Sequence, residues 1–497
     1  MKTILYVLIP FSYLFILLFQ IDQSMLEDLG RHLKMGEAIM QCLCVPQTNL
    51  FSYTNADFPV VNHEWLTQVV LFFFYKNFGL QSLLILKMII LTITFGIVYF
   101  LAKQKSSWYW LTVVSLLCII IFSARFRVRP EMFSYLFLSL FLLIIFLYEK
   151  SKRKFLILLP LLQVLWVNMH IYFILGLVIY GSFVLQEYLI KKKHNRFLFI
   201  IGGLLLLATL LNPQFLAGAL LPFTFSSNYG LSVQENMSVF EFGKYAPSFI
   251  YTLTLQVMTF EVLAGIFLIL LPVLFKKTSI APLLNGLVSA ILGFRYVRTI
   301  SLFGLLGLQP LTEKLSDLEI WLGKKTDRYF INTMKALVFA VTLFVSYLYA
   351  HGLYQNNVLK FGYQPYAEDA TNFINNNQLR GPILNNYHIG NYLIYGLYPK
   401  EKIFIDARPE MYPKEFLKDY ERMLVDQKFF DKQVKKYNIN LIVFGVQLED
   451  PLTIRPFMLR LIQSKEWVPV FADGNVTVMI KNEKKNQEVI QKLGIKT

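Results

Sequence analysis

Apolar runs of about 20 residues recur through the first 350 positions, and no other feature constrains the fold as strongly. A helix rises 1.5 Å per residue, so each run can cross a hydrocarbon core of ~30 Å. Only 16% of the 497 residues are charged, whereas a soluble protein carries roughly a quarter. The sequence therefore predicts a polytopic α-helical membrane protein and excludes a soluble enzyme, a nucleic-acid binder and a disordered scaffold.

About eleven transmembrane helices are expected, and they form a transmembrane domain over residues 1–350. The expected spans are 3–20, 80–102, 107–123, 130–148, 155–168, 171–190, 197–212, 249–275, 279–294, 298–312 and 331–350. Residues 65–78 are a short apolar piece that we place in the membrane interface, although the sequence alone leaves open whether they cross. No small-x-small cleavage site follows the first run, so it is interpreted as a retained helix.

Charge in the connecting loops predicts the orientation. The loops on one side, at 103–106, 149–154, 191–196, 276–278 and 313–330, hold 16 Lys and Arg, of which 13 are Lys. The short opposite loops hold six, of which five are Arg. By the positive-inside rule, the N-terminus is cytoplasmic, and the loop 21–79 and the tail 351–497 lie outside the cytoplasmic membrane.

The arginines at the external membrane edge suggest a phosphate site. A guanidinium is a planar fork that matches phosphate, whereas Lys is a hydrated point charge. Pro130 favours an extended Arg129, and alternate residues of an extended stretch point to one side. For any single Arg, snorkelling at a helix end is the favoured explanation, whereas five on one face favour a phosphate site. The predicted carrier-phosphate site consists of Arg125, Arg127, Arg129, Arg295 and Arg298 with His170.

The first external loop holds the strongest candidates for catalysis. Asp28 and His32 are four residues apart and would share a helical face. A carboxylate near an apolar boundary can act as a general base or a metal ligand, although a solvated loop whose acids only cap helices explains the same pattern. The candidate catalytic residues are Asp28, Glu27, Glu64, His32 and His63. Lys87 and Glu261 are further ionisable residues within apolar runs, for which structural and functional roles are equally expected.

The tail after residue 351 has the pattern of a small α/β domain. Strands are expected near 382–384, 402–406, 440–445, 467–473 and 475–480, with helices between them at 366–377, 413–424, 428–437 and 454–464. Asp406, Arg408 and Glu410 follow an expected strand and are candidate substrate-binding residues, as is Asn168 in the bundle. A buried Asp–Arg pair of purely structural role is the alternative, and the sequence favours it.

The cysteine pattern implies no disulfide framework. Cys118 lies within an apolar run, and Cys42 and Cys44 are too close in sequence for an unstrained bridge.

The order of these parts resembles bacterial glycosyltransferases of the GT-C superfamily, which take sugars from polyprenyl-phosphate carriers. More narrowly, it is similar to a poorly characterised group of bacterial multi-pass proteins. The matching residues are Asp28, Gly30, His32 and Leu33 with Gly36-Glu37; Phe51 to Thr54; His63 to Leu66; Arg129-Pro130; Trp166, Asn168 and His170; Asn212-Pro213; and Asp406, Arg408, Glu410 and Tyr412. Arg31 stands where that group has an aromatic residue, and the chain has no unambiguous Asp-x-Asp.

The resemblance implies the site, the partners and the location. The first-loop carboxylate, here Asp28 with Glu27 or Glu64 as substitute, would be the base or the ligand of a divalent cation such as Mg²⁺ or Mn²⁺. The partners would be a polyprenyl-phosphate-linked sugar donor, a glycan, lipid or protein acceptor, and membrane lipids. The location would be the bacterial cytoplasmic (inner) membrane.

Three functions are weighed. The first is an inverting glycosyl transfer on the outer face, with Asp28 as base and the Arg set with His170 on the phosphate. The second is a non-catalytic flippase or transporter of lipid-linked glycans, although no inverted repeat is visible. The third is a ligase-like transferase that uses Arg and His without a carboxylate base.

Overall fold

The computed structural model describes residues 2–150, 153–191, 195–224, 236–245, 251–274, 280–446 and 451–495. The chain divides into two compact units. Unit 1 draws its described residues from Met1–Ile21, Leu83–Phe215 and Ser232–Gly362, and unit 2 from Asp22–Ser82, Leu216–Leu231 and Tyr363–Thr497. The first loop thus folds with the tail.

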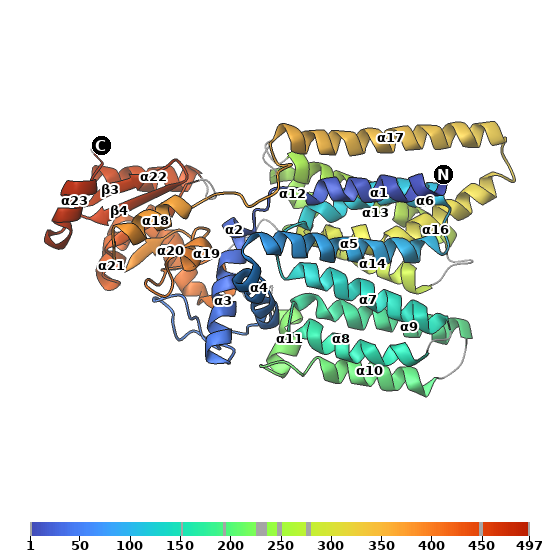
Figure 1. Ribbon diagram of the computed structural model, residues 1–497, viewed down its shortest axis with the longest axis horizontal. Helices are drawn as coiled ribbons and strands as arrows, with labels where there is room; N and C mark the ends of the chain where they lie inside the picture. The colour runs from blue at the N-terminus through green and yellow to red at the C-terminus, as the bar shows by residue number, and fades with distance from the viewer. Residues whose placement is uncertain are drawn as a thin grey trace. The chain divides into compact units, whose positions relative to one another are not determined.

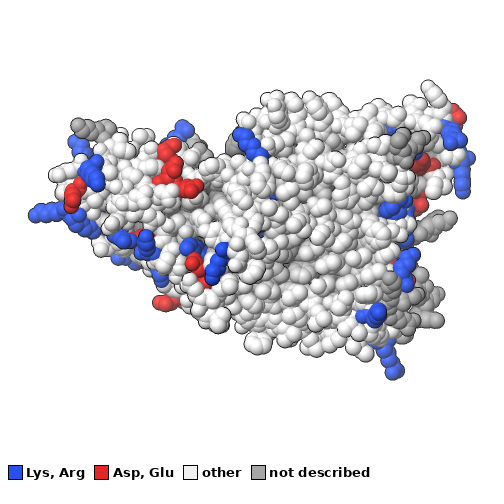
Figure 2. Space-filling view, in the orientation of Figure 1, with Lys and Arg blue, Asp and Glu red and all other residues white. Residues whose placement is uncertain are grey.

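Unit 1 is a bundle of helices that run side by side (Figure 1). Its helices are α1 (Lys2–Leu18), α5 (Gln81–Lys103), α6 (Trp108–Phe122), α7 (Glu131–Glu149), α8 (Leu158–Val167), α9 (Ile174–Lys191), α10 (Arg196–Ala208), α12 (Val239–Tyr245), α13 (Tyr251–Leu274), α14 (Ile280–Arg295), α15 (Ile300–Leu306), α16 (Leu308–Leu322) and α17 (Arg328–Gln355). The face of these helices that Figure 2 shows is largely free of charge between its two ends.

Among the described residues, six helical segments are long and apolar enough to cross a membrane. They contain α5, α6, α7, α9, α13 and α17. Among these residues, four shorter apolar helices coincide with four other expected spans, and Val297–Leu306 covers the first part of the expected span 298–312. A multi-pass membrane protein is therefore supported, while the number of crossings stays a prediction.

The expected span 298–312 is not one helix. It is divided at Gly307 into α15 and α16. Pro310 lies in the first turn of α16, where its missing N–H is tolerated. The helix then continues to Leu322 through residues that we expected to form a loop, and it buries the charged Glu313 and Lys314.

Unit 2 combines helices of the first loop with a small α/β fold. The first loop contributes α2 (Ser24–Glu27), α3 (Leu29–Cys42) and α4 (Trp65–Phe78), and α11 (Leu216–Thr224) belongs to the same unit. A four-stranded sheet has the order β1-β2-β4-β3. The strands are β1 (Ile383–Asn385), β2 (Leu441–Gly445), β3 (Trp467–Ala472) and β4 (Val476–Lys481), with β1 parallel to β2 and the other pairs antiparallel.

Six helices accompany the sheet: α18 (Glu368–Asn376), α19 (Gly390–Leu397), α20 (Lys414–Val425), α21 (Gln427–Lys436), α22 (Pro451–Gln463) and α23 (Gln487–Leu493). The α/β character expected of the tail is confirmed. The expected strand at 402–406 is wrong. Ile403 instead exchanges backbone hydrogen bonds with the first loop, donating to the carbonyl of Phe51 at 3.0 Å and accepting from the amide of Tyr53 at 3.2 Å.

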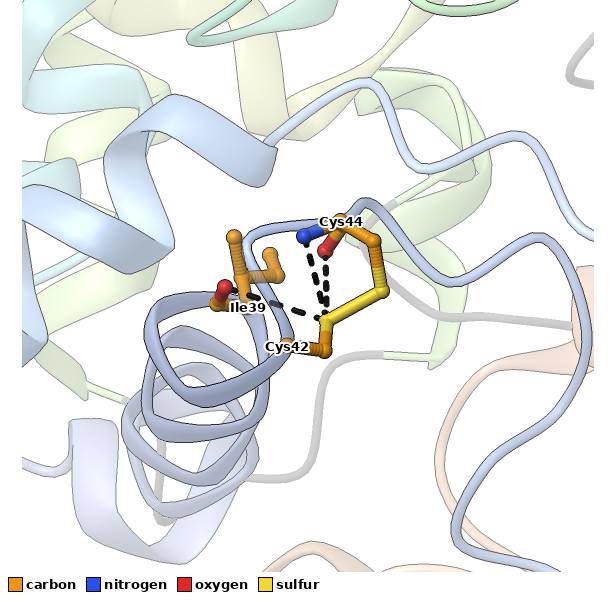
Figure 3. The surroundings of a disulfide bond; sticks show 3 residues. All are labelled: Ile39, Cys42 and Cys44. Atoms are coloured by element: carbon orange, nitrogen blue, oxygen red, sulfur yellow. Dashed lines mark hydrogen bonds between the residues drawn. A yellow bond between two sulfur atoms is a disulfide. The ribbon is translucent and has the colours of Figure 1, made fainter.

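Cys42 and Cys44 form a disulfide, contrary to the expectation from their spacing (Figure 3). Leu43, which ends α3, has a left-handed backbone with φ 52°. This turn brings the two Cα atoms to 5.1 Å, a usual separation for a disulfide. The free Cys118 is buried in α6, as expected of an apolar run.

Candidate active site

The arginine loop of unit 1 differs from the extended array that we expected. Ser123–Arg125 form a 3₁₀ helix and the following residues bend before α7 begins at Glu131. Arg125 is buried and its Nε and Nη2 donate to the two carboxylate oxygens of Glu131, at 2.7 and 3.2 Å. Arg127 and Arg129 are half-buried. Arg125 is therefore bound within the protein, whereas Arg127 and Arg129 keep part of their surface exposed.

Lys87 joins α5 to the same loop. Its side chain is 1% exposed, and its Nζ donates to the carbonyl of Phe126 at 3.3 Å. The sequence left the role of this lysine open. The structure shows that it adds a cation and a hydrogen bond beneath the loop that carries Arg127 and Arg129.

His170 is held in one orientation by its neighbours. Trp166 Nε1, which can only donate, gives its hydrogen to Ser134 Oγ at 2.7 Å. The Ser134 hydroxyl lies 2.8 Å from His170 Nδ1, and the amide of Tyr172 also donates to that nitrogen at 3.4 Å. Because Nδ1 accepts both, the proton of the neutral ring is assigned to Nε2. His170 therefore presents a donor at Nε2.

The remaining candidates of unit 1 differ in their surroundings. Asn168 donates to the carbonyls of Val164 and Leu211 at 2.7 and 2.8 Å, so its amide ties α8 to the segment after α10. Arg298 bonds Asn236 at 3.4 Å and lies at the hydroxyl of Tyr172. Because Tyr172 follows His170 by two residues, Arg298 lies in the same part of unit 1 as His170.

Arg295 ends α14, with its guanidinium 5.7 Å from the ring centre of Tyr296.

In unit 2, Asp28 lies between α2 and α3 with its side chain 24% exposed. The amide of Asn391, from α19, donates to Asp28 Oδ1 at 3.4 Å and to the carbonyl of Glu27. Gly30 makes this approach possible, because a Cβ there would lie 2.7 Å from the Cβ of Tyr395. The first-loop acid is thus oriented by a residue of the tail.

A chain of charged side chains extends from Asp28 into the interior of unit 2. Arg31 Nη2 lies 3.8 Å from Asp28 Oδ1 and 3.2 Å from His32 Nε2. Since the guanidinium only donates, Nε2 accepts from it, and the Gln68 amide nitrogen lies 3.4 Å from the other ring nitrogen, Nδ1. That nitrogen lies 3.9 Å from Glu64, which is 3.6 Å from His63. The structure therefore brings together four of the five predicted catalytic side chains through Arg31.

Glu27, the fifth candidate, contributes its backbone carbonyl to the contact with Asn391.

Asp406 and Arg408 form a buried ion pair, with Nε–Oδ1 and Nη2–Oδ2 distances of 2.7 and 2.6 Å. Tyr412 donates to the same carboxylate at 3.1 Å, and Arg408 reaches Asn49 of the first loop at 3.5 Å. This geometry corresponds to the structural alternative named for the Asp–Arg pair.

Glu410 differs from its neighbours, because its side chain stays partly exposed. Burial nevertheless raises the pKa of Glu410 to about 7, although Arg408 and Arg31 oppose the shift. The positive charge of Arg31 acts on the Glu410 carboxyl of the tail. Glu410 is therefore electrostatically connected to the series of groups that joins Arg31 to Asp28.

Sequence reasoning missed His388 and Asn391. Both follow β1, on the segment leading into and forming α19. Burial lowers the pKa of His388, while the negative charge of Asp28 acts against that shift. The sequence offered one signal for these two residues, which is their position after a buried strand. Only the tertiary fold shows that their segment contacts the first loop.

A divalent cation does not fit the donor set around Asp28. Among the residues that the structure describes, no group of three or more His, Cys, Asp or Glu side chains is arranged to hold a metal. Asp28 has a guanidinium and an amide N–H directed at it, and both repel a cation. No step is therefore derived through a metal.

No protein-family model matches this sequence, and neither does any curated protein. Solved structures do match. The Archaeoglobus fulgidus oligosaccharyltransferase AglB, in complex with an inhibitory peptide and a dolichol-phosphate, aligns over 98% of this chain and 75% of its own, with a TM-score of 0.63 and 10% identity.

The same archaeal enzyme in complex with Zn and sulfate aligns over 95% of this chain and 73% of its own, with a TM-score of 0.60 and 10% identity. ArnT from Cupriavidus metallidurans in the apo state aligns over 96% and 97%, with a TM-score of 0.54 and 12% identity. The GT-C fold implied by the sequence resemblance is confirmed.

Proposed function

We propose that this protein is a membrane glycosyltransferase that moves a sugar from a polyprenyl-phosphate carrier to an extracytoplasmic acceptor. One observation carries the proposal beyond the fold: an oriented carboxylate, Asp28, begins a connected series of charged and imidazole groups in the first loop. Unit 1 separately holds His170, which presents a donor, and Arg298, which lies at the hydroxyl of the nearby Tyr172.

In the proposed reaction the acceptor oxygen attacks the anomeric carbon of the donor sugar with inversion. The bond from that carbon to the carrier phosphate breaks, and the electron pair leaves with the phosphate. Asp28 accepts the proton of the acceptor hydroxyl. Arg31, whose Nη2 lies 3.8 Å from Asp28 Oδ1, helps to hold this carboxylate in place.

The groups of unit 1 are assigned to the carrier phosphate. Arg127, Arg129 and Arg298 supply planar donors suited to phosphate oxygens, with Arg295 at the end of α14. His170 adds a hydrogen bond from Nε2. Fixed donors of this kind stabilise the charge that develops on a leaving phosphate.

The AglB structure supports a lipid-phosphate donor, since that protein was solved with a dolichol-phosphate and a peptide. The external location of both candidate groups is likewise part of the proposal, resting on the loop charges and on the Cys42–Cys44 disulfide, which forms in oxidising compartments.

The test uses the full-length protein in liposomes with a panel of polyprenyl-phosphate sugars and candidate acceptors. Release of free polyprenyl phosphate, measured by mass spectrometry, together with a glycosylated acceptor supports transfer. Movement of intact donor across the bilayer without release would overturn the proposal in favour of a transporter. Heat-inactivated protein controls for spontaneous hydrolysis.

A further inference from the structure

A second polar site lies in unit 1, at the opposite end of the bundle from the arginine loop. It is a cavity of about 240 Å³, room for about eight water molecules at ~30 Å³ each. Helix α7 begins at Glu131 in the arginine cluster and ends at Glu149 in the cavity lining. At 1.5 Å per residue, the two sites are about 27 Å apart along α7.

The lining of this cavity is divided between apolar walls and a polar floor and mouth. Leu142, Phe146, Ile179 and Phe183 form walls from α7 and α9. The polar side chains are Gln104, Lys105, Glu149, Lys150, Gln186, Asn285 and Gln309. Lys and Arg gather at this end of the bundle, where α5 and α7 end (Figure 2).

The floor is held in place by hydrogen bonds. Gln186, which is 6% exposed, donates to Glu149 Oε1 at 2.9 Å and accepts from the amide of Ala281 at 2.9 Å. The side-chain amide of Gln186 therefore connects α9 to the end of α7 and to the start of α14. Its geometry does not depend on a ligand.

Asn285 supplies the observation that points to a ligand. Its side chain is 3% exposed, and in the part of the chain that the structure describes its Oδ1 has no hydrogen-bond partner. A buried acceptor without a donor is unfavourable by about 1–3 kcal/mol. A molecule that brings a donor to the cavity would remove this cost.

The mouth of the cavity is cationic. Lys105, Glu149 and Lys150 are exposed residues of the lining, and Glu313 attracts Lys105. Lys105 and Gln104 also line an adjoining cavity of about 800 Å³. Lys103, Arg328 and Lys335 line that second cavity, where Asp317 and Glu319 are the acids. An anionic group is therefore favoured at the mouth and a hydrogen-bond donor at the floor.

We infer that this cavity binds the headgroup of a glycerophospholipid that carries a hydrogen-bond donor beyond its phosphate, such as ethanolamine or glycerol. Lys105 and Lys150 contact the phosphate. The ammonium or hydroxyl group donates to Asn285 and Glu149. The acyl chains remain in the bilayer, beyond apolar walls such as Leu142 and Phe146. This site is independent of the proposed transferase activity.

The experiment measures lipid retained by the full-length, delipidated protein after incubation with phosphatidylethanolamine or phosphatidylcholine of identical chains. Phosphatidylcholine is the matched control ligand, because it has the same phosphate but no headgroup donor. The wild type is expected to retain ethanolamine lipid about tenfold better, the value of one well-made buried hydrogen bond. Equal retention of the two lipids would overturn the inference.

Two sets of variants locate the site. Asn285→Leu is expected to abolish the preference between the two lipids, and Lys105→Gln with Lys150→Gln to weaken the binding of both. The control is Lys324→Gln with Lys325→Gln, which removes the same charge at residues outside both cavity linings and is expected to change nothing. If the control variant lost as much lipid binding as the variant with Lys105→Gln and Lys150→Gln, the proposed location of the site would be contradicted.

A further arm separates a lipid from a soluble phosphate ester. Glycerophosphoethanolamine, which has the headgroup without the chains, is added as competitor. It is expected to displace the lipid only weakly. Displacement at concentrations equal to those of the lipid would overturn the assignment to a membrane lipid.

Discussion

Arg125 and Glu131 form a two-pronged ion pair inside unit 1, with Nε–Oε1 and Nη2–Oε2 distances of 2.7 and 3.2 Å. Both side chains are nearly excluded from solvent, at 6% and 3% exposure. The pair spans Pro130 and joins the arginine loop to the first turn of α7. Arg125 therefore has a structural role, whereas Arg127 and Arg129 are the residues proposed to bind phosphate. All three occur in one alternating sequence pattern.

This difference predicts opposite outcomes for substitutions within one loop. Arg125→Met leaves Glu131 buried and uncompensated, so we expect a loss of about 3–5 kcal/mol in stability. Combining it with Glu131→Leu should recover much of that loss. Arg127→Gln and Arg129→Gln should instead weaken binding of a polyprenyl phosphate with little change in thermal unfolding. Equal thermal destabilisation by all three arginine substitutions would contradict the separation.

The Asp406–Arg408 pair is predicted to stabilise unit 2. Arg408→Met leaves a buried carboxylate, and we expect a loss of about 3–5 kcal/mol, measured as faster proteolysis of the tail and earlier thermal unfolding. Asn49→Ala, which removes a weaker contact of the same guanidinium, should cost less. Wild-type stability of Arg408→Met, with donor turnover lost, would assign the pair to substrate instead.

Glu410 predicts a stability that falls as the pH rises. Its pKa is raised by burial from an ordinary value of 4.5 to about 7, so the folded state binds the extra proton between these values. The stabilisation is complete below pH 4.5 and is lost as the pH rises through about 7. Glu410→Gln should flatten the thermal stability between pH 5 and pH 8. An unchanged slope in this variant would refute the assignment.

The Cys42–Cys44 disulfide predicts a labelling pattern. In intact cells, a membrane-impermeant maleimide should not react with the protein until a reductant is added, and should then label both residues. Cys118 is buried and should stay unlabelled until the protein is denatured. The Cys42→Ser, Cys44→Ser double variant is the control for background. Labelling of the wild type without reductant would contradict the disulfide.

The sequence predicted those elements that form because of the residues within them. Residues 65–78 were expected as one amphipathic or short apolar piece, and α4 has those bounds. The strand expected at 402–406 did not form, because the backbone of Ile403 bonds to Phe51 and Tyr53, about 350 positions earlier. A strand-like pattern does not reveal that its partner is a loop in another part of the chain.

The candidate site shows the same limit. Asp28, His32 and Glu64 were recognisable as a cluster of acid and imidazole groups within one loop. His388 and Asn391 were not, because their proximity to Asp28 depends on the packing of α19 against α3, which Gly30 allows. The pairing of Arg125 with Glu131 was also hidden, since a separation of six residues across a proline matches no regular helical spacing.

The most direct test of the account compares Asp28→Asn with Glu37→Gln for release of polyprenyl phosphate and formation of glycosylated acceptor. Glu37 lies on α3, the helix that follows Asp28, and pairs with Lys34 at 2.9 Å, so its substitution controls for the loss of an acidic charge in this part of the first loop. The account predicts that Asp28→Asn lowers turnover by about 10²-fold or more with donor binding retained, and that Glu37→Gln keeps wild-type turnover. Full turnover in Asp28→Asn, together with its loss in His170→Ala, would contradict the account and indicate a transferase that works without a carboxylate base.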